Sequence, residues 1–184
     1  TNGTVNIDAA DNITFTADAD YNGPVSFSYT ISDGSLTDTA TVSGTITPVN
    51  DAPVADDELG LTTAEDTLLN IDVLTGDTDA DGNPLSVTEI NGTAISVGGT
   101  VAVTNGSVTL LADGTLDFTP ASNYNGAVNF TYTVSDGLLT DTGNVGINVT
   151  VVNDAPVADD ELGLTTAEDT LLNIDVLTGD TDAD

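Results

Sequence analysis

The chain repeats itself at an interval of 103 residues. The segment formed by residues 50–81 recurs without a change as residues 153–184. The head of the chain aligns at the same interval without a gap: YNGPVSFSYTISDGSLTDT at 21–39 pairs with YNGAVNFTYTVSDGLLTDT at 124–142. Self-similarity at one fixed interval is typical of an array of like domains.

This interval divides the chain into the C-terminal half of one repeat (1–49), a complete repeat (50–152) and the N-terminal third of the next (153–184). Both ends cut through a repeat. We therefore expect either a window on a longer chain or a chain whose tail and head complement each other between molecules.

The complete repeat has the pattern of a β domain without helices. In residues 128–134 and 145–151, apolar residues alternate with small polar ones or glycine, the period-2 pattern of a half-buried strand. Asn-Gly and Asp-Gly turn dipeptides separate such stretches, as at Asn105-Gly106 and Asp136-Gly137. Seven to nine short strands in about 100 residues indicate an all-β, antiparallel two-sheet sandwich of immunoglobulin type. The short link VVNDAPVA, with its single proline, favours a stiff junction between repeats.

The charge of the chain excludes several functions. It contains 31 acidic residues and no Lys, Arg or His, for a net charge of −31. Without basic side chains there is no patch to grip phosphate, so nucleic acid is excluded as a partner and an anionic membrane surface nearly so. The sequence contains no stretch of 18 or more apolar residues, the length that a membrane-spanning helix needs. The absence of Cys, His and Lys removes most nucleophiles and general bases, and the few aromatic residues argue against a paired-carboxylate glycosidase, so we expect no enzyme.

The densest group of acids has the spacing of a calcium loop. Asp77, Asp79 and Asp81 occupy alternate positions and are followed by Gly82. Alternating carboxylates followed by glycine form the first half of an EF-hand-like loop, but the distal glutamate and flanking helices of that motif are missing. This is therefore a β-loop site that needs ligands from elsewhere. Without a cation, each close pair of carboxylates would repel by about 1 kcal/mol in water.

Strand direction predicts which other residues meet this loop. If strands near 57–63 and 140–152 run upward and those near 67–75 and 127–135 run downward, the acidic loop, the link at Asn50 and the Asp136 turn share the lower end of the sandwich. Glu65 and Asp66 would then lie at the upper end with Asn123 and Asn125, facing the next repeat. If the acids served only to keep the surface solvated, they would be spread over it rather than gathered at its ends. We interpret the isolated acids Asp72, Glu89 and Asp117 in this way.

The motifs EDT, DTDADGNPLSV, DGTLDFTP, YNG, FTYTVSDG and VNDAP resemble the bacterial cadherin-like (tandem-95 type) repeats of giant RTX-type surface adhesins. The likeness covers the whole chain, and it extends to the extender repeats of an Antarctic ice-binding adhesin. It implies tandem immunoglobulin/cadherin-like sandwiches with Ca²⁺ at their junctions, serving as an extracellular spacer on the bacterial cell surface. The implied metal ligands are Asn50, Asp51, Glu65, Asp66, Asp77, Asp79, Asp81, Asp136, Asn153, Asp154, Glu168, Asp169, Asp180, Asp182 and Asp184. The glycine-rich nonapeptides of RTX secretion regions do not occur in the chain.

Two other functions compete with the spacer. One is a self-assembling filament or surface layer, in which 153–184 of one molecule completes 1–49 of another. In either case the partners would be neighbouring repeats, of the same chain or of identical chains. The other is a ligand-binding module, which the scarcity of aromatic residues disfavours.

Overall fold

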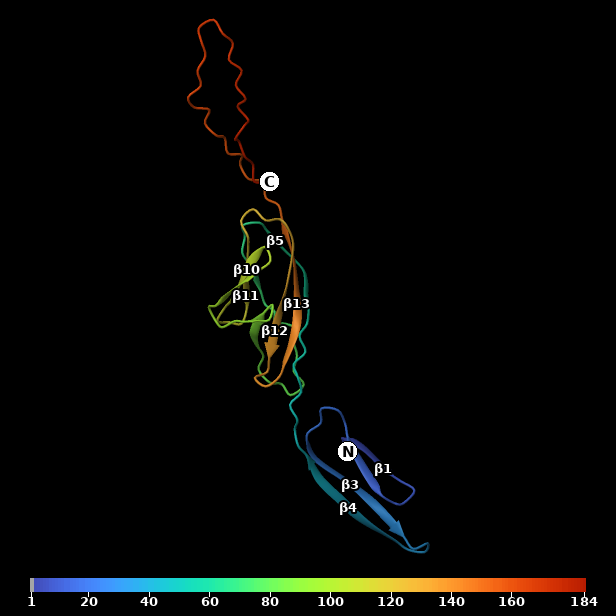
Figure 1. Ribbon diagram of the computed structural model, residues 1–184. Coiled ribbons are helices and arrows are strands. Elements are labelled where there is room, and N and C mark those ends of the chain that lie inside the picture. The colour runs from blue at the N-terminus through green and yellow to red at the C-terminus, as the bar shows by residue number, and fades with distance from the viewer. Residues whose placement is uncertain (1) are drawn as a thin grey trace.

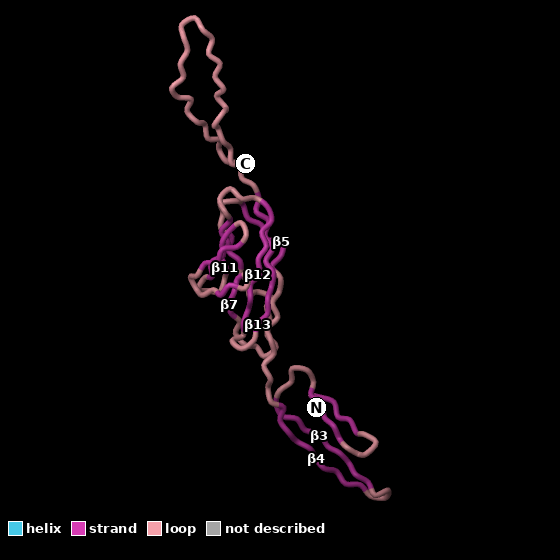
Figure 2. Tube along the Cα trace, viewed as in Figure 1, coloured by secondary structure: helices cyan, strands magenta, loops and turns pink. Residues whose placement is uncertain are grey.

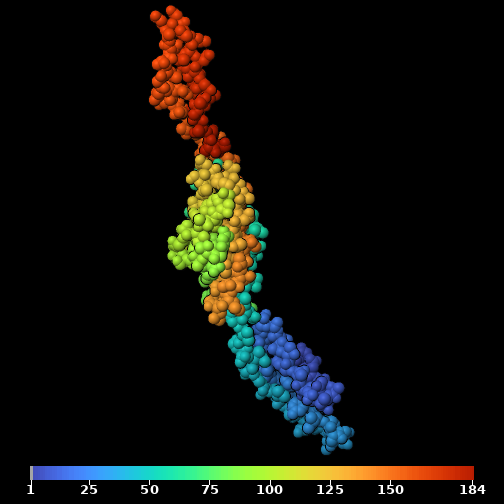
Figure 3. Space-filling model, viewed as in Figure 1, coloured from blue at the N-terminus to red at the C-terminus, as the bar shows by residue number. Residues whose placement is uncertain are grey.

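The computed structural model describes residues 2–184, which form three parts in a row (Figure 1). Residues 2–49 contain four strands, residues 50–152 contain nine, and no strand is found in residues 153–184 (Figure 2). The parts are joined by narrow connections near residue 50 and residue 152 (Figure 3). The array is therefore elongated, and each junction is a small region where the end of one repeat meets the start of the next.

The complete repeat is a two-sheet sandwich. One sheet has the order β6-β11-β10-β9 and the other the order β5-β13-β12-β7-β8. The strands are β5 (Glu58–Ala64), β6 (Leu69–Ile71), β7 (Ser86–Ile90), β8 (Thr93–Ala94), β9 (Thr100–Val103), β10 (Gly106–Leu110), β11 (Leu116–Pro120), β12 (Gly126–Ser135) and β13 (Thr140–Thr150). The sequence prediction of an all-β, immunoglobulin-like sandwich is confirmed.

The core lies between the two sheets of residues 50–152. Phe118 of β11 stacks on Phe130 of β12 with ring centroids 6.3 Å apart, so that aromatic rings join the sheets. Tyr132 and Leu116 have no exposed surface. Phe130 and Tyr132 belong to the alternating apolar positions of residues 128–134, and every second residue of β12 is buried over its first half.

Strand direction determines which loops share an end of the sandwich. β13 pairs antiparallel with β12 and parallel with β5. The sandwich is therefore not wholly antiparallel, contrary to the sequence prediction. The parallel pairing of β5 and β13 agrees with the prediction that both strands run upward. The link before β5 therefore lies at the same end as the β12–β13 turn, and the residues after β5 lie at the end where β13 leaves.

The flanking parts resemble pieces of the same sandwich. In residues 2–49, β1 (Gly3–Ile7) pairs with β2 (Ile13–Ala17), and β3 (Gly23–Ser32) pairs with β4 (Thr37–Ile46). The β3–β4 register places Tyr29 opposite Ala40, as the β12–β13 register places Tyr132 opposite Gly143. In residues 153–184 a single bridge joins Val157 to Thr181. No helix in residues 2–184 is long and apolar enough to cross a membrane.

Candidate metal centre at the repeat junctions

At the lower end of the complete repeat, the acidic loop is fastened to the link that precedes β5. Val54 and Thr78 exchange two backbone hydrogen bonds, of 2.7 and 3.0 Å. On either side of this bridge a loop carboxylate accepts from a linker amide: Asp81 Oδ2 from Asp51 N at 2.8 Å, and Asp77 Oδ1 from Asp56 N at 2.7 Å. The loop and the link therefore form one unit, which we call the linker clip (residues 50–56 and 77–83).

The middle carboxylate organises the loop itself. Asp79 Oδ1 accepts hydrogen bonds from the backbone N–H groups of Asp81 at 2.9 Å and Asn83 at 3.0 Å. The reversal between them uses Gly82, whose φ of +73° is strained for residues with a side chain. A carboxylate that accepts the amides of its own loop with one oxygen leaves its other oxygen available to a cation.

Asn50 connects the clip to the turn between β12 and β13. Its amide nitrogen donates to Asp136 Oδ2 at 2.7 Å, and its amide oxygen accepts from Asn83 Nδ2 at 2.9 Å. The hydrogen bond from Asn50, followed by those from the backbone of Leu139 and Leu138, holds the pKa of Asp136 below its ordinary value. The lower group predicted from strand direction, Asn50, Asp51, Asp77, Asp79, Asp81 and Asp136, is therefore brought together.

Two carboxylate oxygens of this group have no partner. Asp77 Oδ2 and Asp79 Oδ2 are buried and accept no hydrogen bond from the described residues. A buried acceptor atom that receives no hydrogen bond costs about 1–3 kcal/mol. Since the whole chain lacks Lys, Arg and His, no side chain could neutralise them.

The side chains as placed do not enclose an ion. Within residues 2–184, no three acidic side chains are grouped closely enough to hold a metal. Several carboxylates point at backbone amides instead, as Asp81 points at Asp51 N. The donor set is nevertheless made of carboxylate, amide and backbone oxygens, which suit Ca²⁺. The residue types and the buried free oxygens therefore fit calcium, provided that some of the carboxylates turn from amides to the ion.

A second group of acids lies at the upper end, where β13 leaves the sandwich. Glu65 is only 4% exposed, and its Oε1 accepts a hydrogen bond from the backbone N–H of Val152 in the next link. Asp66 Oδ1 accepts from Asn123 N at 3.2 Å. Partial burial, followed by the charges of Asp184, Asp66, Glu65 and Asp182, raises the pKa of Asp154. Acids of two successive repeats therefore meet at this junction.

Residues 153–184 reproduce the linker clip without the rest of the sandwich. Asp154 N donates to Asp184 Oδ2 and Asp159 N donates to Asp180 Oδ1, both at 2.8 Å. Asn153 donates to Asp154 O at 2.7 Å. The clip is thus encoded locally. Glu168 and Asp169 form a turn within this segment, and no described residue of another repeat hydrogen-bonds to them.

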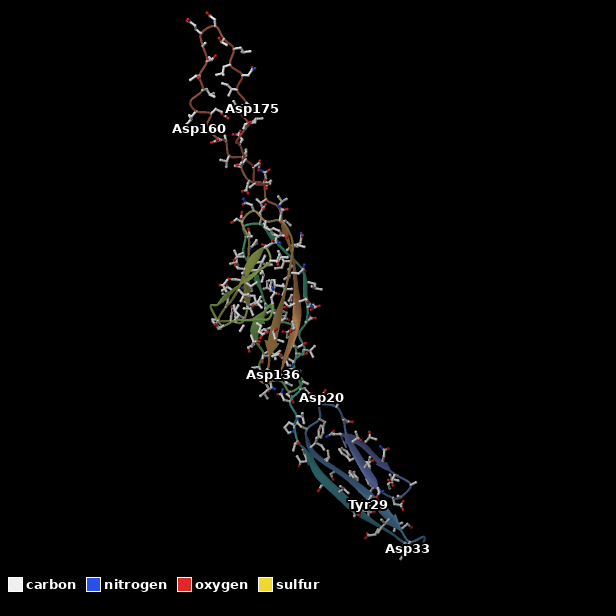
Figure 4. The ribbon with its side chains drawn as sticks, viewed as in Figure 1. Asp20, Tyr29, Asp33, Asp136, Asp160 and Asp175 are labelled. Atoms are coloured by element: carbon white, nitrogen blue, oxygen red, sulfur yellow. The ribbon has the colours of Figure 1, made fainter. Side chains whose placement is uncertain are left out.

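The sequence prediction missed three residues of the lower junction. Asp20 of the preceding part lines a hollow of about 220 Å³ together with Asp51 and Asp81, and Figure 4 shows it at the end of its part that faces the complete repeat. Asn83 and Asp56 contribute through the clip. The 103-residue alignment could have revealed Asp20, because it pairs with Asn123, which was already placed at the upper end.

Comparisons with known proteins agree with this fold. A family model described as a bacterial Ig domain matches residues 1–45 and 50–148. No curated protein matches the sequence.

Solved structures with a similar course share little sequence with the chain. The endo-fucoidan hydrolase MfFcnA4 from glycoside hydrolase family 107 is 20% identical, with 83% of this chain and 22% of that chain covered and a TM-score of 0.38. Mouse clustered PcdhgC3 EC1-3 is 13% identical, with 85% and 54% covered and a TM-score of 0.40. Domains 4 and 5 of the S-layer protein SbsC are 15% identical, with 79% and 64% covered and a TM-score of 0.33. The H294Q form of the same hydrolase is also similar, and this chain spans only 24% of its length.

Proposed function

Because the chain belongs to the bacterial Ig domain family, we propose that it is part of a spacer of an extracellular bacterial surface adhesin, with Ca²⁺ bound where successive repeats meet. The elongated arrangement and the narrow junctions support a spacer (Figure 3). The resemblance of the repeat motifs to RTX-type adhesin extenders supports the surface location. In this function the sandwiches supply length and the junctions supply stiffness.

One observation carries the calcium proposal: Asp77 Oδ2 and Asp79 Oδ2 are buried without a donor in a chain that has no basic side chain. A hard divalent cation that prefers oxygen ligands would neutralise both. Asp77, Asp79, Asp81, Asn50 and Asp136 would hold it at the lower junction. Glu65, Asp66, Asp154, Asp182 and Asp184 would hold its equivalent at the upper junction. Ca²⁺ would supply the positive charge that this surface lacks.

Thermal unfolding with calcium and with EDTA tests the proposal. A ligand that binds only the folded state at about 100 times its Kd stabilises by about 2.7 kcal/mol. We therefore expect a higher Tm in millimolar Ca²⁺ than in EDTA, with little effect from Mg²⁺, which demands a stricter geometry. Asp79→Asn should lose most of the calcium-dependent part of this shift. Identical melts in Ca²⁺ and EDTA would overturn the proposal.

The head-to-tail filament stays a prediction. Size-exclusion chromatography at several protein concentrations tests it, since a strictly monomeric species at all concentrations rules it out.

A further inference from the structure

A tyrosine hydroxyl reaches from the core of the sandwich to the acidic loop. Tyr132 lies in β12 and has no exposed surface. Its hydroxyl oxygen is 2.8 Å from Asp77 Oδ1 and 2.7 Å from the carbonyl oxygen of Asp56. The single hydroxyl proton is shared between these two acceptors, and both belong to the linker clip.

The neighbours of this hydroxyl make it the donor. Asp77 Oδ1 and the carbonyl oxygen of Asp56 can only accept hydrogen bonds, so the one proton of the Tyr132 hydroxyl is donated to the linker clip. Asp77 Oδ1 receives this hydrogen bond in addition to the one from Asp56 N.

The two hydrogen bonds on Oδ1 fix the direction of the other oxygen. With Oδ1 held by the sandwich through Tyr132 and by the link through Asp56, Asp77 cannot rotate without losing one of them. Its Oδ2 remains buried and without a donor. Groups that orient a ligand from behind typically change metal affinity by 10- to 100-fold when they are removed.

We infer that Tyr132 is a positioning residue for the lower junction, which holds Asp77 and the acidic loop in the geometry that binds the cation. This inference rests on the proposed calcium function. In this role, the buried Tyr132 side chain links the cation site to the core of the sandwich. In the clip of residues 153–184, Asp180 Oδ1 accepts from Asp159 N, as Asp77 Oδ1 accepts from Asp56 N.

The chain provides a matched control for Tyr132. Tyr29 occupies the equivalent position of the preceding repeat, 103 residues earlier, opposite Ala40 in the same register. No hydrogen bond from its hydroxyl to a described residue is found, and it is 38% exposed. Tyr29→Phe removes the same atom from the same strand position without touching a carboxylate.

A calcium titration followed by ¹H–¹⁵N correlation spectra of the 184-residue chain separates the two junctions. The amides of Asp81 and Asn83 report on the lower one, and those of Asp154 and Asp184 report on the upper one. Tyr132→Phe should weaken calcium binding at the lower junction about tenfold or more and leave the upper junction unchanged. Tyr29→Phe should change neither. Equal lower-junction affinities in wild type and Tyr132→Phe would overturn the inference while leaving the calcium proposal intact.

A double-mutant cycle shows whether Tyr132 acts through Asp77. In an Asp77→Asn background, Tyr132→Phe should have little further effect on calcium affinity. An undiminished effect there would contradict the positioning role. If wild type shows no calcium-dependent change at Asp81 and Asn83, the proposed function itself fails, and the inference fails with it.

The wild-type protein offers a second measurement in case Tyr132→Phe does not fold. The ring ¹³Cζ signal of Tyr132 should shift with the same calcium midpoint as the Asp81 amide, while that of Tyr29 should not. A Tyr132 signal that ignores calcium contradicts the inference.

Discussion

Gly143 shows how closely single atoms define the lower end of the sandwich. A Cβ at this position of β13 would lie 2.5 Å from Cε1 of Tyr132 and 2.7 Å from the carbonyl oxygen of Asp56. The tyrosine ring and the linker backbone therefore occupy the space that any other residue would fill. The tyrosine that donates to Asp77 therefore packs directly against Gly143.

Gly143→Ala should destabilise the complete repeat by about 1–3 kcal/mol, the usual cost of overpacking a closed core. Part of the strain would be relieved by moving Tyr132 or Asp56, so calcium affinity at the lower junction should fall as well. Chemical denaturation in EDTA measures the first effect, and a calcium titration measures the second.

Gly146→Ala is the matched control, because its Cβ would meet the flexible side chain of Leu59 at 3.2 Å rather than a backbone carbonyl. An equal loss of stability in the two variants would show that the Tyr132 packing is not special. Ala40 stands at the position equivalent to Gly143 in the preceding repeat. We therefore expect the Tyr29 ring to sit farther from β4 than the Tyr132 ring sits from β13.

Edge strand β5 depends on one carboxylate for part of its attachment to β13. Asp57 Oδ1 accepts from both the backbone N–H and the side-chain amide of Asn144, each at 2.8 Å. These hydrogen bonds, the backbone one first, lower the pKa of Asp57. The ionised form is therefore stabilised in the folded state relative to the unfolded state.

The sign of this shift predicts a pH dependence. The stability that Asp57 contributes is fully present above its ordinary pKa of 3.8 and is lost as the pH falls through the lowered folded-state pKa. Asp57→Asn keeps an acceptor oxygen but removes the charge. The stability difference between wild type and this variant, measured by denaturation in EDTA, should therefore shrink as the pH falls from 6 to about 3.

Asp160→Asn is the control, since this equivalent of Asp57 in residues 153–184 accepts no hydrogen bond from the described residues. Its difference from wild type should not follow the same curve. A wild-type advantage over Asp57→Asn that stays constant or grows toward acid pH would contradict the assignment.

The strands could be predicted from the sequence, but the hydrogen bonds that hold the acidic loop could not. Alternation in 128–134 and 145–151 fixes which residues face the core, and strand direction alone brought Asn50 and Asp136 to one end. The sequence predicts Asp77 only as a metal ligand. In the structure, its Oδ1 also accepts a hydrogen bond from the Tyr132 hydroxyl in the sandwich. This contact joins residues 55 positions apart, and neither the period-2 pattern nor the calcium-loop spacing contains information about it.

At the scale of the whole molecule, we expect residues 2–184 to bend at the two narrow junctions between the parts (Figure 3). The sandwich of residues 50–152 is held by a continuous core. The connection to residues 2–49 runs through a link of few residues beside the hollow lined by Asp20, Asp51 and Asp81. In the proposed function, the acids on the two sides would repel each other across this link without a cation, and a bound Ca²⁺ would bridge them.

The distance distribution between two spin labels across the lower junction tests this account most directly. The chain has no cysteine, so Ser43→Cys in β4 and Thr140→Cys in β13, both at exposed positions, give two unique labels. Electron–electron double resonance should give a narrow distribution in Ca²⁺ and a broad one in EDTA, and Asp79→Asn should stay broad in both. A distribution whose width is the same in Ca²⁺ and EDTA would contradict the claim that calcium stiffens the junction.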